Sequence, residues 1–119
     1  MSKNVIRIFG SCNPKTKMGG YSAIVGERVI TGGAADTTTA RMELTALIKA
    51  LETFRPSAEK REVQFYAKSK YIANGMMNFR ERRENGFQTK AGTEMANLDL
   101  WGKLIDTANK RNIFIKVAK

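Results

Sequence analysis

The residues in this chain that could do chemistry are mostly cations. Lysine and arginine number 21 against 11 aspartates and glutamates, which gives the 119 residues a formal net charge of +10. Between positions 79 and 91, basic residues alternate with aromatic ones: Phe79, Arg80, Arg82, Arg83, Phe87 and Lys90. Arginine beside aromatic rings suits phosphate pairing combined with stacking. The excess charge favours a polyanionic partner, so the composition predicts a nucleic-acid-binding protein; the alternative is a solvated surface that only maintains solubility.

Several classes of chemistry are excluded by residue type. The sequence contains no histidine, which removes imidazole as a general base, a zinc ligand or a pH switch. Zinc fingers and serine–histidine triads are therefore impossible. Cys12 is the single cysteine, so no disulfide can form within the chain.

Nothing in the sequence indicates a membrane protein. No apolar run approaches the roughly eighteen residues that a spanning helix needs. The first four residues lead into a strand-like segment instead of a signal peptide. A basic amphipathic helix with a bulky apolar face is also missing. We expect no membrane partner and a cytoplasmic location.

The elements that must position these residues follow from the apolar pattern. Strands are predicted at 5–9, 21–25, 28–31, 63–66 and 113–117, and helices at 40–54, 69–77 and 97–110. Gly26-Glu27 predicts a tight hairpin between the second and third strands, and Thr37–Thr39 suits the cap of the first helix. The order β-β-β-α-β-α-α-β predicts one α/β domain over residues 1–119 with a mixed sheet.

Short motifs, in order along the chain, resemble type 1 ribonucleases H. The motifs are Gly10-Ser11-Cys12 with Asn13-Pro14 and Gly19-Gly20-Tyr21, Arg41-Met42-Glu43-Leu44, Gly86-Phe87-Gln88-Thr89-Lys90, and Asn97-Leu98-Asp99-Leu100-Trp101. The resemblance implies a ribonuclease H-like fold. Its five-stranded mixed sheet has three antiparallel strands plus two parallel ones, helices mainly on one face, and in this chain no C-terminal helix.

The same resemblance implies a site where four carboxylates hold two divalent metal ions for phosphodiester cleavage. Only the helix glutamate is matched, by Glu43, while Phe9 and Lys68 stand at two of the other ligand positions. We therefore expect no bound metal, no cofactor and no enzymatic activity. Two interpretations of Glu43 stay open: Lys68 replaces the cation beside it, or Glu43 is a remnant held in a half-buried ion pair. Rescue of the site by Asp36 is a third possibility.

Binding could persist without catalysis, because the resemblance implies that other residues contact the nucleic acid. The predicted nucleic-acid-binding residues are Ser11, Cys12, Asn13, Lys15, Lys17, Thr39, Arg41, Lys70, Arg80, Arg82, Arg83 and Lys90. The predicted partner is RNA, single-stranded DNA or an RNA–DNA hybrid. A protein-interaction domain of the same fold and an enzyme with an altered metal site are the alternative functions.

A missing C-terminal helix would also leave apolar residues of the sheet in contact with water. We expect Ile6, Ile8, Ile24 and Phe114 to be exposed on that face, and the strand 113–117 to form an edge. The sequence therefore predicts a homo-oligomer that forms through the sheet face or through this edge.

Overall fold

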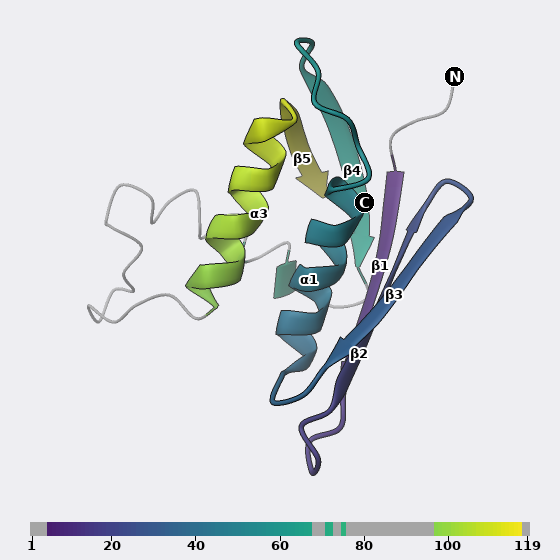
Figure 1. Cartoon of the computed structure of the whole chain (residues 1–119), viewed down its shortest axis with the longest axis vertical. Coiled ribbons are helices and arrows are strands. Elements are labelled where there is room, and N and C mark those ends of the chain that lie inside the picture. The colour runs from purple at the N-terminus through teal and green to yellow at the C-terminus, as the bar shows by residue number, and fades with distance from the viewer. Residues whose placement is uncertain (1–4, 68–70, 73–74, 76–96, 118–119) are drawn as a thin grey trace.

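The alternating segments of the sequence form a mixed sheet in the computed structural model, which describes residues 5–67, 71–72, 75 and 97–117 (Figure 1). Its elements are β1 (Val5–Cys12), β2 (Gly19–Val25), β3 (Arg28–Ala34), α1 (Thr39–Leu51), β4 (Arg61–Ala67), α3 (Leu98–Lys110) and β5 (Ile113–Val117). Tyr71, Ile72 and Gly75 are helical, and the rest of the predicted helix 69–77 lies outside the described residues.

The strands lie in the order β3-β2-β1-β4-β5. The pairs β1–β2 and β2–β3 are antiparallel, whereas β1–β4 and β4–β5 are parallel. The prediction of three antiparallel strands plus two parallel ones is confirmed. The hairpin is confirmed too: Val25 pairs with Arg28, and Gly26 between them has a φ of 62°, in the left-handed region that glycine adopts without steric cost.

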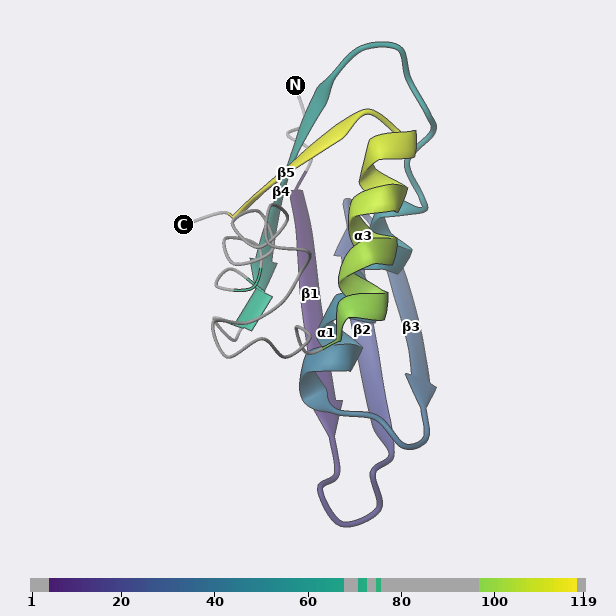
Figure 2. The same ribbon diagram turned by 90° about the vertical axis from the view of Figure 1, so that its left-hand side faces the viewer.

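The described helices α1 and α3 cover the same face of the sheet (Figure 2). Side chains on a strand alternate between the two faces, so every second residue points toward the helices. Ile6, Ile8 and Phe65 belong to this covered set and are at most 1% exposed. The expectation that Ile6 and Ile8 are exposed is therefore wrong, because the pleat turns them toward α1. Phe114, at 40% exposed, lies on the other face as expected.

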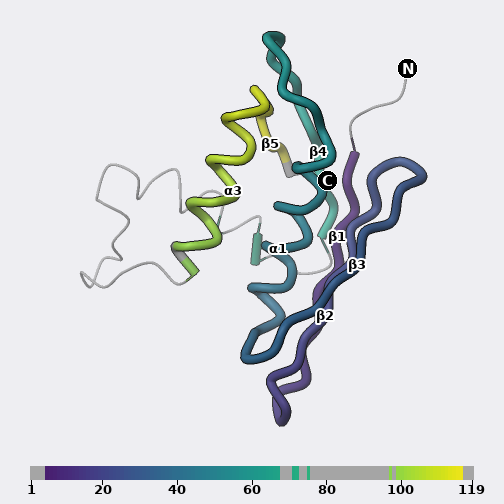
Figure 3. The backbone as a smooth tube through the Cα atoms, in the orientation of Figure 1, coloured from purple at the N-terminus to yellow at the C-terminus, as the bar shows by residue number. Residues whose placement is uncertain are grey.

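The core between helices and sheet is apolar and continuous. Leu44, Leu47 and Leu51 of α1 meet Trp101 and Leu104 of α3 in one cluster of fully buried side chains. The two helices run side by side over the sheet (Figure 3), and residues of both are in contact. Thr38 caps α1, since its side chain accepts a hydrogen bond from the Arg41 amide at 3.1 Å. No helix in the described parts of the chain is long and apolar enough to cross a membrane.

Candidate nucleic-acid interface

Three segments with predicted binding residues meet at one end of the sheet: the end of β1, the loop 13–18 and the start of α1. The thiol of Cys12 donates to the carbonyl of Thr37 at 3.2 Å, and the amide of Thr37 donates to the carbonyl of Lys17 at 3.1 Å. These two bonds tie β1 and the loop to the residues just before α1. The structure thus brings Ser11, Cys12, Asn13 and Thr39 into one region.

The loop has a defined conformation that presents its lysines to solvent. The side-chain oxygen of Asn13 accepts from the amides of Lys15 at 2.8 Å and Thr16 at 3.3 Å. The carbonyl of Asn13 also accepts from the amide of Lys17, whose φ is 61°. Both lysine side chains are exposed. Asn13 therefore fixes the backbone of a turn that carries two positive charges.

The start of α1 adds a favourable electrostatic field. No acidic residue lies in its first turn, and Thr39 is exposed there. The amino-terminal end of a helix carries a partial positive charge from its unpaired amides, which favours anions. The loop lysines and this helix end together form a positively charged surface, which we call the loop–helix surface (Ser11–Lys17 and Thr39).

Arg41, also predicted to bind nucleic acid, is held by a neighbouring carboxylate. Its guanidinium donates to both oxygens of Asp99, at 3.1 and 2.8 Å, and to Oδ1 of Asn97 at 3.2 Å. The hydrogen bonds and charge of Asp99 raise the pKa of Arg41, and the bond from Arg41 lowers the pKa of Asp99. Asn97 in turn donates to the hydroxyl of Tyr71 at 2.8 Å, and Trp101 donates to the same hydroxyl at 3.3 Å. This network joins the start of α1 to the start of α3.

Glu43 lies under the surface instead of on it. It is only 3% exposed and faces Gly10 of β1, where a Cβ atom would lie 2.7 Å from the Glu43 amide nitrogen and 2.8 Å from its Cγ. Gly10 thus lets α1 approach β1 closely. Phe9, placed by the resemblance at a ligand position, is 46% exposed. Its outward direction on β1 is opposite to that of Ile8, on the face that α1 does not cover.

The donor set of the described residues does not make up a two-metal site. Across residues 5–67, 71–72, 75 and 97–117, no group of three or more histidine, cysteine, aspartate or glutamate side chains lies close enough together to hold an ion. Magnesium requires several oxygen ligands in near-octahedral order.

The remaining predicted residues, Lys68, Lys70, Arg80, Arg82, Arg83 and Lys90, lie outside the described residues. Sequence reasoning missed the pairing of Arg41 with Asp99, which joins positions 58 residues apart. It also missed the contact of Gly10 with Glu43. The signal for Gly10 was its place at the end of a strand that must pack under a helix, because glycine in a strand often marks a close backbone approach.

The fold and this site define a class: α/β domains whose mixed five-stranded sheet places a glutamate of the first long helix against the end of the first strand. A model of the RNase H family matches residues 3–119. The chain therefore belongs to the ribonuclease H family.

Individual relatives agree with this assignment. Ribonuclease H of Francisella tularensis subsp. novicida (strain U112) is 36% identical over 109 residues, which cover 87% of this chain and 70% of that protein. Ribonuclease H of Francisella philomiragia is 35% identical with the same coverage. A foamy viral protease-reverse transcriptase, solved in complex with RNA/DNA hybrid, has a TM-score of 0.70 at 21% identity, over 96% of this chain and 17% of that chain. Its complex with dsDNA gives a TM-score of 0.69, over 97% of this chain and 80% of that chain. At 21% identity, these two structures support the assignment of the fold.

The comparisons also correct one expectation. The expectation that the chain is not an enzyme is contradicted, because its relatives are named Ribonuclease H, an enzyme, and match most of its length. That expectation came from Phe9 and Lys68, which stand where the resemblance implies metal-binding carboxylates. Phe9 and Lys68 are single positions, whereas the match to the family spans residues 3–119.

Proposed function

We propose that the chain binds an RNA–DNA hybrid on the loop–helix surface. The observation that carries this proposal is the pair of hydrogen bonds through Thr37, which fixes the lysine-bearing loop beside the start of α1. Family membership supports it, as does the hybrid bound by the similar foamy viral protein.

Each part of the surface has a role in this binding. Lys15 and Lys17 pair with phosphates as exposed point charges, and the positive end of α1 attracts a further phosphate. The hydroxyls of Ser11 and Thr39, both exposed, can hydrogen-bond to sugar 2′-hydroxyls, by which proteins distinguish RNA from DNA. Recognition of this kind depends on shape and charge, so little base preference is expected.

A salt series on labelled hybrid, RNA duplex and DNA duplex tests the proposal. The Lys15→Ala/Lys17→Ala variant should reduce the log–log salt slope for hybrid by about 2, since each lost phosphate contact removes about 1. The control Lys103→Ala/Lys110→Ala removes the same charge from α3 and should leave the slope within error. Equal losses in both variants would show that net charge alone drives binding, against a defined surface.

The same mixtures with magnesium extend the test to the reaction of the family. The length of the RNA strand is followed on denaturing gels, with Glu43→Gln as the matched variant, because glutamine keeps the shape of the buried side chain without its charge. Cleavage that requires Glu43 would connect the bound hybrid to hydrolysis.

Self-association is a second proposal, which rests on the position of β5. Within the described sheet β5 is an edge strand, and an edge strand can recruit a strand of another chain. Ile113 and Ile115 point into the core, so pairing would use the backbone and not these side chains. Light scattering at micromolar concentration decides between a dimer and a 13.3 kDa monomer.

A further inference from the structure

The sheet face that α1 and α3 do not cover carries exposed aromatic rings. Phe9 is 46% exposed and Tyr66 40% exposed. Arg7 lies between them: it pairs with Tyr66 across β1 and β4, and it precedes Phe9 by two residues on β1. Residues two apart on a strand point the same way at a separation of about 7 Å. The three side chains therefore form a short row, which we call the ring row (Arg7, Phe9, Tyr66).

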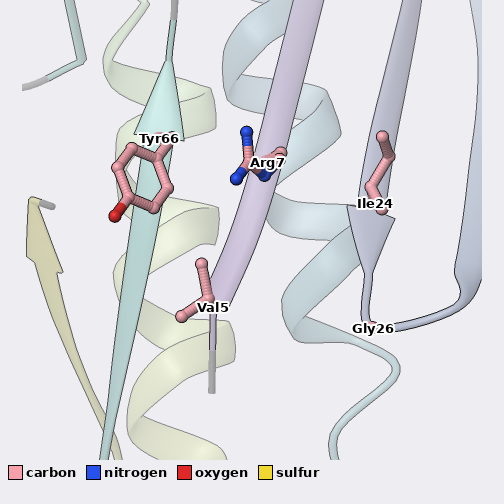
Figure 4. Close-up of a pocket in the computed structure, with 5 residues that line it drawn as sticks. All are labelled: Val5, Arg7, Ile24, Gly26 and Tyr66. Carbon is pink, nitrogen blue, oxygen red and sulfur yellow. The ribbon is translucent and has the colours of Figure 1, made fainter. Parts of the chain in front are cut away.

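The surface around the ring row is hollowed in two places. One hollow of about 390 Å³ is lined by Val5, Arg7, Ile24, Gly26 and Tyr66 (Figure 4). A second, of about 320 Å³, is lined by Phe9, Gly10, Ser11, Gly20, Tyr21, Ser22 and Gly32. Of the latter residues Gly20 has room where a Cβ atom would lie, with the Gly32 carbonyl 3.6 Å away, so a flat group can approach the backbone there. Each hollow thus has one exposed ring in its wall.

The charge of the ring row is positive. None of the described residues that line the two hollows is acidic. The guanidinium carbon of Arg7 lies 5.3 Å from the centroid of the Tyr66 ring, so the cation is held over the aromatic face. A planar guanidinium on a ring offers both a stacking surface and a phosphate partner.

Phe114 on the same face provides an internal contrast. It is as exposed as Tyr66, at 40%, and Lys60 lies 5.7 Å from its ring centroid. However, Phe114 pairs with Glu62, whose carboxylate is half exposed and lies 3.8 Å from Lys116. The Glu62 carboxylate opposes a polyanion beside this ring and pairs with Lys116, so this end of the face, unlike the ring row, has an acidic group next to its exposed ring.

From these observations we infer that the ring row is a binding site for single-stranded nucleic acid, next to the loop–helix surface, with which its second hollow shares Ser11. Bases stack on Phe9 and on the Arg7–Tyr66 pair, and Arg7 holds a phosphate between them. A single strand is the occupant because its bases are free to stack on side chains, whereas the bases of a duplex stack on one another. The net charge of +10 complements this partner. A second copy of the chain would bring an equal positive charge to the same face.

Fluorescence anisotropy with labelled oligothymidylate and oligouridylate of about fifteen nucleotides tests the inference on the full chain. Phe9→Ala and Tyr66→Ala should each weaken binding roughly 5- to 150-fold, the range found when a stacking ring is removed. Tyr66→Phe, which keeps the ring, should bind like the original chain. Phe114→Ala is the matched control on the same face and should have no effect. All three positions are exposed, and thermal melts check that each of the four variants folds.

Three results would overturn the inference: no binding of either oligonucleotide, equal affinity in the ring variants and the original chain, or the same loss in Phe114→Ala. Light scattering supplies a fourth. A dimer that Tyr66→Ala converts to monomer would make this face an interface between copies of the chain. Hybrid binding is measured in parallel, so failure of the loop–helix surface is seen separately: Lys15→Ala/Lys17→Ala affects hybrid, and the ring variants affect single strands.

Discussion

The two faces of the sheet are built from the same strands and differ completely in what they expose. On the face beneath the helices, Ile6, Ala23 and Val63 are fully buried. On the other face, Arg7, which follows Ile6 on β1, and Tyr66 of β4 contact solvent and each other. The covered face therefore supplies stability, whereas the other face presents charged and aromatic side chains to solvent. Side chains alternate between the two faces along a strand. Substitutions at adjacent positions should therefore affect different properties, stability on the covered face and binding on the other.

Phe65 and Tyr66 give the largest expected contrast, because they are adjacent on β4 and point to opposite faces. Phe65 is 1% exposed, and Phe65→Ala should cost about 3–5 kcal/mol of unfolding free energy through lost burial and a cavity. Tyr66→Ala should cost clearly less, since the ring is 40% exposed and its contact with Arg7 is worth about 0.5–1 kcal/mol. Urea denaturation measures both. Similar losses in the two variants would show that the other face also supports the fold.

The glycines provide the next contrast. Gly10→Ala should destabilise the chain by about 1–3 kcal/mol, because its methyl group would lie 2.7 Å from the backbone of Glu43 and would push α1 away from β1. Gly102 of α3 has open space around it, so Gly102→Ala should stabilise the helix by about 0.5–1 kcal/mol. In thermal melts, Gly10→Ala should lower the melting temperature and Gly102→Ala should raise it. A neutral Gly10→Ala would mean that α1 can shift without cost.

Much of this arrangement could be predicted from the sequence, and the misses have one physical origin. The strands, the hairpin at Gly26 and the cap by the threonine cluster depend on local patterns, and the structure confirms them. Which face of β1 the helices cover depends on contacts distant in sequence. That is why Ile6 and Ile8 were assigned to the wrong side, although their alternation with Arg7 and Phe9 was visible.

The candidate site shows the same division. The loop lysines and Thr39 were identified by motif, and the structure brings them together. The partner of Arg41 was not identified, because nothing near position 41 indicates Asp99. Long-range pairing of this kind requires the fold before it can be predicted.

The Arg41–Asp99 pair gives the smallest expected effect, and it tests whether the two helices act as one unit over the covered face. The side chain of Asp99 is 65% exposed, so solvent screens the pair, and its coupling should be no more than about 1 kcal/mol. A double-mutant cycle of Arg41→Ala and Asp99→Ala at pH 7 isolates this coupling from the separate losses. The pKa of Asp99 is lowered in the folded chain. The coupling should therefore be fully present above the ordinary aspartate pKa of about 3.9 and should disappear as the pH falls through the lowered value.

The control for this last test is Asp106, an aspartate of similar exposure whose partner Lys110 lies on the same helix. Asp106→Ala breaks that pair and should lower the free energy of unfolding by about 0.3–0.5 kcal/mol, through α3 alone. Hydrogen exchange distinguishes the two cases. Loss of Asp99 should speed exchange at the first turns of both α1 and α3, because the pair joins their starts, whereas loss of Asp106 should act only within α3. Unchanged exchange in α1 after Asp99→Ala would show that packing around Trp101 alone holds the helices together.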